Sequence, residues 1–168
     1  AVSTLARRLG LAAIEPQPWD AEGTPGPSAW GGGEPRLTPE GEPIRLFGFG
    51  EIAMGGPAYC DYLFPDGVLL QGLGASALFS ADGRYFVAPI PSRERWGLLV
   101  LDRPAQAARR LEIDCFWELD SFTEQLHGRC SPLGENAAYR LDLRALLARV
   151  PAMPLRPFGD LWLEAESP

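Results

Sequence analysis

Two short and similar patterns in the middle of the chain each predict a β-hairpin. Residues 63–70 read LFPDGVLL, and residues 78–87 read LFSADGRYFV. In both, an Asp-Gly pair separates two apolar runs. Asp tolerates a left-handed backbone and Gly adopts it at little cost, so this arrangement is the strongest short-range signal for a hairpin. The two patterns therefore constrain the centre of the protein to antiparallel β-sheet built from strands that are close in sequence.

Strand-like runs continue on both sides of these hairpins. From Ile44 onward, short apolar and aromatic runs alternate with connections rich in Gly, Pro and Asp, which is the pattern of a meander. The expected strands are residues 44–49, 58–64, 68–72, 77–80, 85–89, 97–102, 109–114, 116–119 and 121–126.

One helix is expected near each end of the chain. Ser3 is placed to cap a short amphipathic helix over residues 4–14, which the prolines that follow would end. Asp142 is placed to cap a second helix over residues 142–150, which has an apolar stripe at helical spacing and is stopped by Pro151.

These elements predict one α+β domain, mainly β, over residues 1–168. We expect an antiparallel meander of about eight to ten strands with a helix near each end, and a real core for a chain of this length. The expected segments are a helix (1–14), a Pro/Gly-rich acidic arm (15–43), the sheet (44–141), a helix (142–150) and a packed tail (151–168).

The sequence FSADGRY at residues 79–85, followed by LLVLD at 98–102, resembles a blade of TolB-like or WD40-like β-propellers. The resemblance covers about residues 63–102, and Ala81 stands where the family has proline. It implies local blade geometry. It does not imply a closed propeller, because no period of about 40 residues recurs and closure needs at least four blades.

The segment from Glu15 to Pro43 carries most of the chain's negative charge. It holds six acids against one arginine, which is −5 of the net −7, together with seven prolines and six glycines. Such a composition predicts a long loop on the surface or a mobile arm. Trp19 and Trp30 lie within it, and because a large apolar ring is unfavourable in water, at least one is expected to pack on the body or on a partner.

Candidate catalytic residues are few. His127 is the only histidine, and although Cys130 lies three residues away, a zinc site needs three or four ligands; a solvated turn is the expected place for His127. The three cysteines, Cys60, Cys115 and Cys130, lack CxxC spacing and are expected to be reduced, buried thiols in a cytoplasm.

Two further motifs have ordinary structural explanations. Residues 48–53 and 72–77 both match G-x-G-x-x-A, but glycine or proline follows each and prevents the helix that a dinucleotide site requires, so glycine kinks in a sheet are expected. Four acids could supply paired carboxylates for a glycosidase, although solvent-facing alternation along strands also explains them: Glu112, Asp114, Glu118 and Asp120.

The sequence favours a protein-binding function without catalysis. The net negative charge argues against nucleic acid, no apolar run approaches the ~20 residues of a membrane span, and no cofactor motif survives its context. An acidic surface with aromatic anchors suits a basic protein partner. The expected contact residues are Trp19, Asp20, Glu22, Trp30, Glu34, Arg95 and Trp96.

The composition resembles that of bacterial immunity proteins, which plug the active site of a toxin. All basic residues but the single histidine are arginine, as in a GC-rich bacterial genome, so we expect a monomeric bacterial cytoplasmic protein that occupies the basic cleft of a toxin. Two alternatives stay open: a carboxylate-dependent hydrolase on a β-sheet, and a scaffold component of a larger propeller-like assembly.

Overall fold

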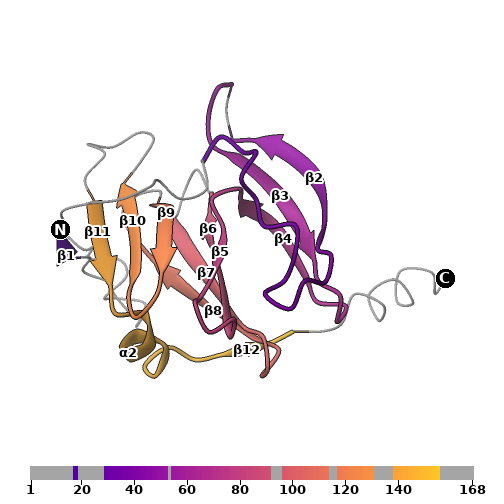
Figure 1. Cartoon of the computed structure of the whole chain (residues 1–168). Helices are drawn as coiled ribbons and strands as arrows, with labels where there is room; N and C mark the ends of the chain where they lie inside the picture. The colour runs from indigo at the N-terminus through magenta and orange to yellow at the C-terminus, as the bar shows by residue number, and fades with distance from the viewer. Residues whose placement is uncertain are drawn as a thin grey trace.

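The computed structural model describes residues 17–18, 29–52, 54–91, 96–113, 117–130 and 138–155. Within these ranges the chain forms three antiparallel β-sheets and one short helix, and no sheet closes on itself (Figure 1). Each sheet is made largely from strands that follow one another in the sequence. The predicted mainly β, antiparallel architecture is confirmed.

The first sheet has three strands in the order β2-β3-β4. They are β2 (Arg45–Glu51), β3 (Ala58–Leu63) and β4 (Leu69–Gly74). The register of β2 on β3 shifts between Phe47 and Gly50, and Gly48 there has φ of 63°. A bulge that contains a left-handed glycine explains the first G-x-G motif, as expected for a kink in a sheet.

The central sheet has five strands in the order β12-β8-β7-β6-β5. They are β5 (Leu78–Phe79), β6 (Tyr85–Ile90), β7 (Gly97–Asp102), β8 (Ala107–Glu112) and β12 (Met153–Pro154). Neighbouring side chains of a strand point to opposite faces, and yet Phe86 and Val87 are both fully buried. The central sheet is therefore covered on both faces.

The third sheet has four strands in the order β1-β11-β10-β9. They are β1 (Gln17–Pro18), β9 (Trp117–Phe122), β10 (Leu126–Cys130) and β11 (Ala138–Leu141). Helix α2 (Leu143–Leu147) follows β11, and the Asp142 side chain accepts a hydrogen bond from Ala145 N at 3.1 Å, which confirms the predicted N-cap.

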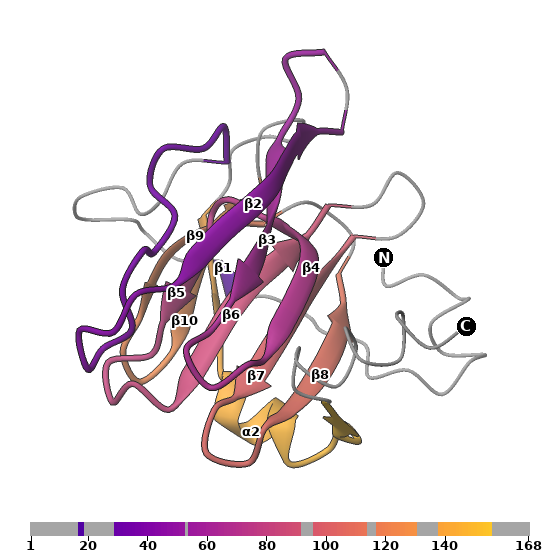
Figure 2. The same ribbon diagram turned by 90° about the vertical axis from the view of Figure 1, so that its right-hand side faces the viewer.

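Two hydrophobic cores hold the sheets together as three layers, with the central sheet in the middle (Figures 1 and 2). One core lies between the central and third sheets and includes Val87, Val100 and Trp117. The other lies between the first and central sheets and includes Tyr62 and Phe86, whose rings meet edge to face at 5.2 Å. The near-continuous apolar sequence of β6 and β7 follows from this two-sided burial.

Both Asp-Gly turns form hairpins, but with a different backbone from the one expected. The glycines are left-handed, with φ of 89° at Gly67 and 70° at Gly83, whereas neither aspartate has positive φ. Each aspartate instead accepts a hydrogen bond at 3.2 Å from the backbone N–H two residues later, Asp66 from Val68 and Asp82 from Arg84. The aspartate is thus used for its carboxylate rather than for its tolerance of left-handed φ.

Several boundaries differ from the prediction. The strand expected at 116–119 and the start of the one expected at 121–126 form a single strand, β9, and the rest of the second is the β9–β10 turn and the first residue of β10. Strand β11 and the remainder of β10 were not expected. The single meander is divided into three stacked sheets. The helix expected over 142–150 ends at Leu147. The predicted helix 1–14 and most of the predicted tail lie outside the described residues. Within the part of the chain that the structure describes, no helix is long and apolar enough to cross a membrane.

The expectation of three reduced cysteines is wrong. Cys130 is disulfide-bonded, and Cys60 is a free, buried thiol. The remaining cysteine, Cys115, lies outside the described residues. Cys130 ends β10, so its bond partner comes from outside its own strand, and a pairing of that kind leaves no short-spacing signature in the sequence.

Candidate protein-binding surface

The second half of the acidic arm is held against the sheets at both ends. Ala29 is fully buried; its N–H donates to Glu118 Oε1 at 3.0 Å, and its carbonyl accepts from Ala58 N at 2.8 Å. Near the other end, Glu40 forms two hydrogen bonds, of 3.1 and 2.6 Å, with the guanidinium of Arg103. Residues 29–43 are therefore a docked surface loop, one of the two forms expected for this segment.

A groove of about 430 Å³ lies between this loop and strand β2. A backbone hydrogen bond from Ile44 N to Arg36 O, 2.9 Å long, joins the two segments at one end. At the other end, the Trp30 indole Nε1 donates to Gly55 O at 3.2 Å. The groove is lined by Trp30, Gly31, Gly32, Glu34, Arg36, Phe49, Gly50, Glu51 and Ala58.

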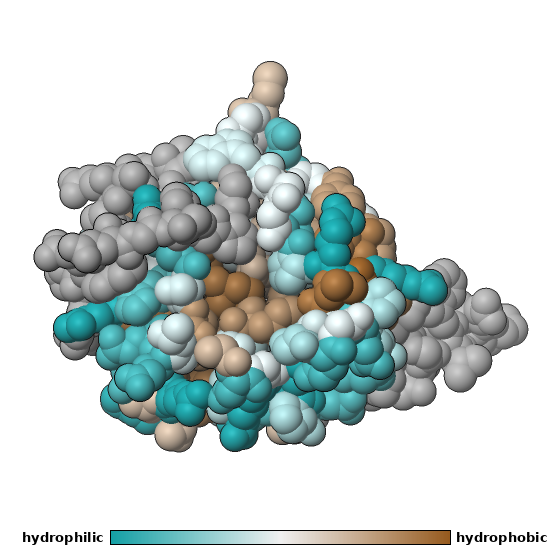
Figure 3. Space-filling view, viewed as in Figure 1, coloured by the Kyte–Doolittle hydropathy of each residue, from teal (hydrophilic) through white to brown (hydrophobic). Residues whose placement is uncertain are grey.

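Large apolar side chains stand exposed around this groove. Trp30 is 51% exposed and Phe49 is 57% exposed, and both line the groove. Phe47 is exposed on the same strand as Phe49, and Met54 is fully exposed in the β2–β3 loop, which projects from the molecule at the top of Figure 1. In Figure 3 the surface near the projecting β2–β3 loop is mostly pale or teal, and the larger brown, apolar surface lies lower, in the middle of this face and towards the side of the first sheet. We call Trp30, Phe47, Phe49 and Met54 the aromatic edge.

The charged groups of the groove have different environments. Glu34 is only 8% exposed, and both of its carboxylate oxygens accept a hydrogen bond from Gly32 N at 3.0 Å. Gly31 and Gly32 have φ of 92° and 91°, and a Cβ on Gly31 would lie 3.0 Å from Glu34 Oε1, so the glycines are needed for this turn around the carboxylate. Glu51 is exposed, and its Oε2 accepts from Gly55 N at 3.2 Å.

The structure brings together only two of the predicted contact residues. Trp30 and Glu34 line the same groove, Trp30 with its ring exposed and Glu34 with its carboxylate turned inward. Trp96 is half-buried and packs on the core between the central and third sheets. The other four lie outside the described residues: Trp19, Asp20, Glu22 and Arg95.

Sequence reasoning missed three residues of the aromatic edge, Phe47, Phe49 and Met54, as well as Glu51 of the groove. A signal for Phe49 was present, because the run LFGFG at residues 46–50 is strand-like but places glycines beside both phenylalanines. Such glycines leave aromatic rings without close neighbours on their own strand and favour a bulge that turns them outward.

Two of the four carboxylates considered for a hydrolase hold parts of the fold together. Glu118 accepts the hydrogen bond from Ala29 N described above, and Asp120 forms a 3.0 Å ion pair with Arg129. Neither lines the groove or the hollow beside His127 at the β9–β10 turn, and Asp114 lies outside the described residues. Among the residues that the structure describes, no group of three or more His, Cys, Asp and Glu is arranged to hold a metal ion.

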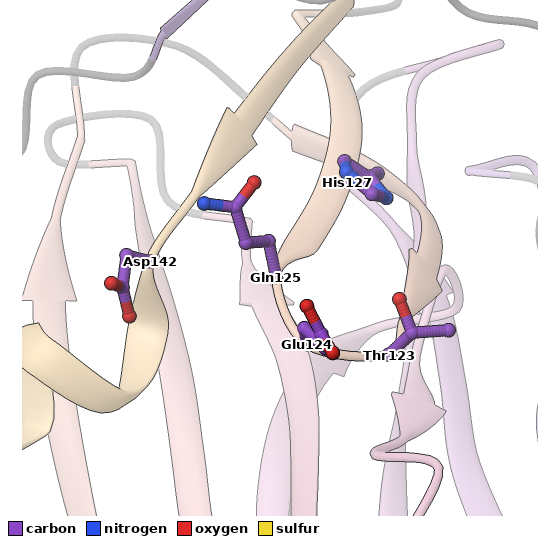
Figure 4. Close-up of a pocket in the computed structure, with 5 residues that line it drawn as sticks. All are labelled: Thr123, Glu124, Gln125, His127 and Asp142. Carbon is purple, nitrogen blue, oxygen red and sulfur yellow. The ribbon is translucent and has the colours of Figure 1, made fainter.

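A second hollow, of about 330 Å³, lies at the β9–β10 turn and the start of α2, and is lined by Thr123, Glu124, Gln125, His127 and Asp142 (Figure 4). His127 lies in β10 rather than in a solvated turn, which corrects the expectation. Its Nδ1 is 3.1 Å from the Oγ of Ser121, directly opposite on β9. Burial, and then the charge of Arg140, lower the pKa of His127, so the imidazole is neutral at pH 7.

This Ser–His contact has the spacing of a nucleophile and its base. Two acids near it have structural roles: Asp142 caps α2, and Asp120, whose charge raises the pKa of His127, is bound by Arg129. Cys60, the free thiol, is protonated at neutral pH, because burial raises its pKa to about 11.

Comparison with protein-family models, with curated proteins and with solved structures finds no match for this chain. The interpretation of the aromatic edge therefore rests on its own geometry and charge.

Proposed function

We propose that this protein is a non-enzymatic binding module that contacts a protein partner through the aromatic edge and the groove beside it. The observation that carries the proposal is the exposure of Trp30 and Phe49 on the two walls of one groove. Exposed aromatic rings are costly in water, and contiguous apolar surface of this kind marks interaction sites.

The position of the surface supports the same proposal. Strand β2 ends the first sheet and has one strand neighbour, β3, among the described residues. The loop 29–36 runs beside β2 and is joined to the chain just before the strand, where Ile44 N donates to Arg36 O. A loop rather than a strand thus lies along this edge, and it protects the edge from indiscriminate strand pairing while its exposed side chains remain available to a partner.

We further propose that the partner is a bacterial toxin with a basic cleft and that the protein acts as its immunity protein. The net charge of −7 supports this assignment, because charge of opposite sign accelerates and orients the encounter of two proteins. Burial of the tryptophan and phenylalanine rings would then supply most of the affinity, as aromatic anchors do at other interfaces.

The test is affinity capture from the native host with the purified full-length protein. Three baits are compared: the natural protein, the Trp30→Ala/Phe49→Ala variant and the Met153→Ala variant. Met153 is exposed on β12 and away from the groove, so it controls for the loss of an exposed apolar side chain. Captured proteins are identified by mass spectrometry, purified and titrated against each bait.

We expect one partner with a basic cleft to bind the natural protein and Met153→Ala alike and to bind the double variant at least about tenfold more weakly, which is the effect of losing a hot spot of more than 1.4 kcal/mol. Equal binding by all three folded baits, or no specific partner at low salt, would refute the proposal. A captured partner whose toxicity in the host is unaffected by this protein would refute the immunity role alone.

A further inference from the structure

The geometry points to a basic side chain, arginine or lysine, as the group of the partner that enters the groove between Trp30 and Phe49. This inference rests on the proposed function and names the chemistry that the same site would recognise. It is carried by two exposed aromatic rings and the exposed Glu51 carboxylate in the lining of one groove.

The carboxylates lie at the Trp30 end. Glu51 closes β2 at the side of the β2–β3 loop, where its Oε2 and the Trp30 indole both bond to Gly55. The Glu34 carboxylate is held at the neighbouring glycines, since Gly32 N donates to it and Gly31 abuts it. Of these two carboxylates Glu34 is buried and Glu51 is exposed, so Glu51 is the one that a group entering the groove can reach.

Arg36, the positively charged residue that lines the groove, enters from the opposite end. Its carbonyl bonds to Ile44 N, and Ile44 is seven residues before Glu51. At about 3.3 Å per residue in a strand, this separates the backbones of Arg36 and Glu51 by roughly 20 Å. The charge of Arg36 therefore offsets that of Glu34, which is two residues away, rather than that of Glu51.

The Trp30 indole and the Glu51 carboxylate, both hydrogen-bonded to Gly55, are positioned to contact a cation. The indole Nε1 of Trp30 is held by Gly55, which fixes the plane of the ring while half of the side chain stays in contact with solvent. Glu51 uses Oε2 for Gly55, and its Oε1 accepts no hydrogen bond from the residues that the structure describes. An ammonium or guanidinium group between them would meet aromatic faces and a carboxylate oxygen, the surroundings in which protein cations are bound.

The experiment titrates the ¹⁵N-labelled, full-length protein with a short peptide, acetyl-Gly-Arg-Gly-amide. The matched probe replaces arginine by citrulline, which has the same shape and no charge. The readout is the indole N–H resonance of Trp30, assigned by its disappearance in Trp30→Phe. We expect the arginine peptide to shift this resonance and the citrulline peptide to bind about 2- to 30-fold more weakly, the range of one cation–π contact.

Two variants separate a specific site from general attraction to an acidic protein. Glu51→Gln keeps the acceptor for Gly55 N but removes the charge, and it should weaken the arginine peptide about 1.5- to 5-fold, the range of an exposed ion pair. Glu42→Gln makes the same charge change at an exposed position that does not line the groove, and it should leave binding unchanged.

Three results would overturn the inference: no shift of the Trp30 resonance with the arginine peptide, equal binding of the citrulline peptide, or equal effects of Glu51→Gln and Glu42→Gln. If the capture experiment succeeds while the arginine peptide fails, the groove binds a partner by another group and only this inference falls. If the peptide binds as expected but capture through the aromatic edge fails, the proposed function falls and the cation site stands.

Discussion

At the scale of the residue, the acids of the arm make different contacts in the folded protein, and the composition of the segment does not tell them apart. Glu34 is turned inward to its glycine turn, Glu40 is bound by Arg103, and Glu51, outside the arm, reaches the groove. The sequence places negative charge on a segment, but whether a given carboxylate faces solvent depends on which distant backbone or arginine lies opposite it.

The contact of Glu40 with Arg103 can be tested through the pKa of Glu40. Its hydrogen bonds from Arg103, and then from Thr38, lower its pKa from 4.5 to about 2. Because the folded pKa lies below the unfolded one, the contribution of Glu40 to stability is complete above about pH 4.5 and is lost as the pH falls towards 2. The measurement is the titration of the Glu40 side-chain carboxyl by ¹³C NMR.

Arg103→Gln should return the Glu40 pKa most of the way to 4.5, because it removes the largest cause of the shift. Arg110→Gln is the matched control, since Arg110 pairs with Glu112 instead. An ordinary Glu40 pKa in the natural protein, or a similar response to both variants, would show that the loop is not docked through this ion pair.

Only part of the binding surface could be predicted from the sequence. At least one of Trp19 and Trp30 was expected to pack on the body or on a partner, and Trp30 is bonded to Gly55 while its ring is half exposed. The bulge that exposes Phe49 has a local signal in the glycines beside it, which was overlooked. The position of β2 at the end of a sheet, where Glu51 lies, depends on strand pairing, which the local sequence does not contain.

At the scale of the element, the two Asp-Gly turns differ at the residue before the aspartate. Pro65 is exposed in the first turn, whereas Ala81 in the second donates its N–H to Phe122 O at 2.9 Å. That bond connects the β5–β6 turn to the end of β9, and therefore the central sheet to the third sheet. Proline, which the propeller-blade pattern has at this place, lacks the N–H and could not make it.

Exchanging alanine and proline is therefore predicted to change the free energy of unfolding by different amounts in the two turns. Ala81→Pro should lower the free energy of unfolding by about 1–3 kcal/mol, because the Phe122 carbonyl loses its donor. Pro65→Ala should lower it by only about 0.4–1 kcal/mol, through the greater freedom of the unfolded chain. Chemical denaturation of both variants measures the difference, and equal costs would contradict the role of the Ala81 N–H.

Most strands up to β9 could be predicted, whereas β10 and β11 could not. The earlier strands carry continuous apolar runs because they border the central layer, as in β6 and β7. Strand β10 (LHGRC) alternates buried and half-buried residues, includes Gly128 and has a register shift beside His127. Gly128 is required there because a Cβ would lie 2.9 Å from Glu118 O, so close packing removes the apolar signal on which a strand prediction depends.

At the scale of the whole molecule, three layers replace the single meander that the sequence suggested. The hairpin signals give antiparallel neighbours but contain no information on where one sheet ends and the next begins. That division is made by contacts between distant residues, such as the buried Ser76, whose Oγ accepts from Leu119 N at 2.7 Å. The bond connects the segment between the first and central sheets to β9 of the third.

The redox state of the cysteines is a property of the whole molecule, and it gives the last prediction. Cys130 is disulfide-bonded and Cys60 is a buried thiol, so protein equilibrated with a glutathione couple of oxidising poise should show one reactive thiol per chain after unfolding in guanidinium chloride. Full reduction should raise this number to three, and Cys60→Ala should lower the oxidised value to zero. Reduction should also lower the free energy of unfolding by about 2–4 kcal/mol, as for other disulfides. Three thiols in the oxidised sample would contradict the disulfide at Cys130.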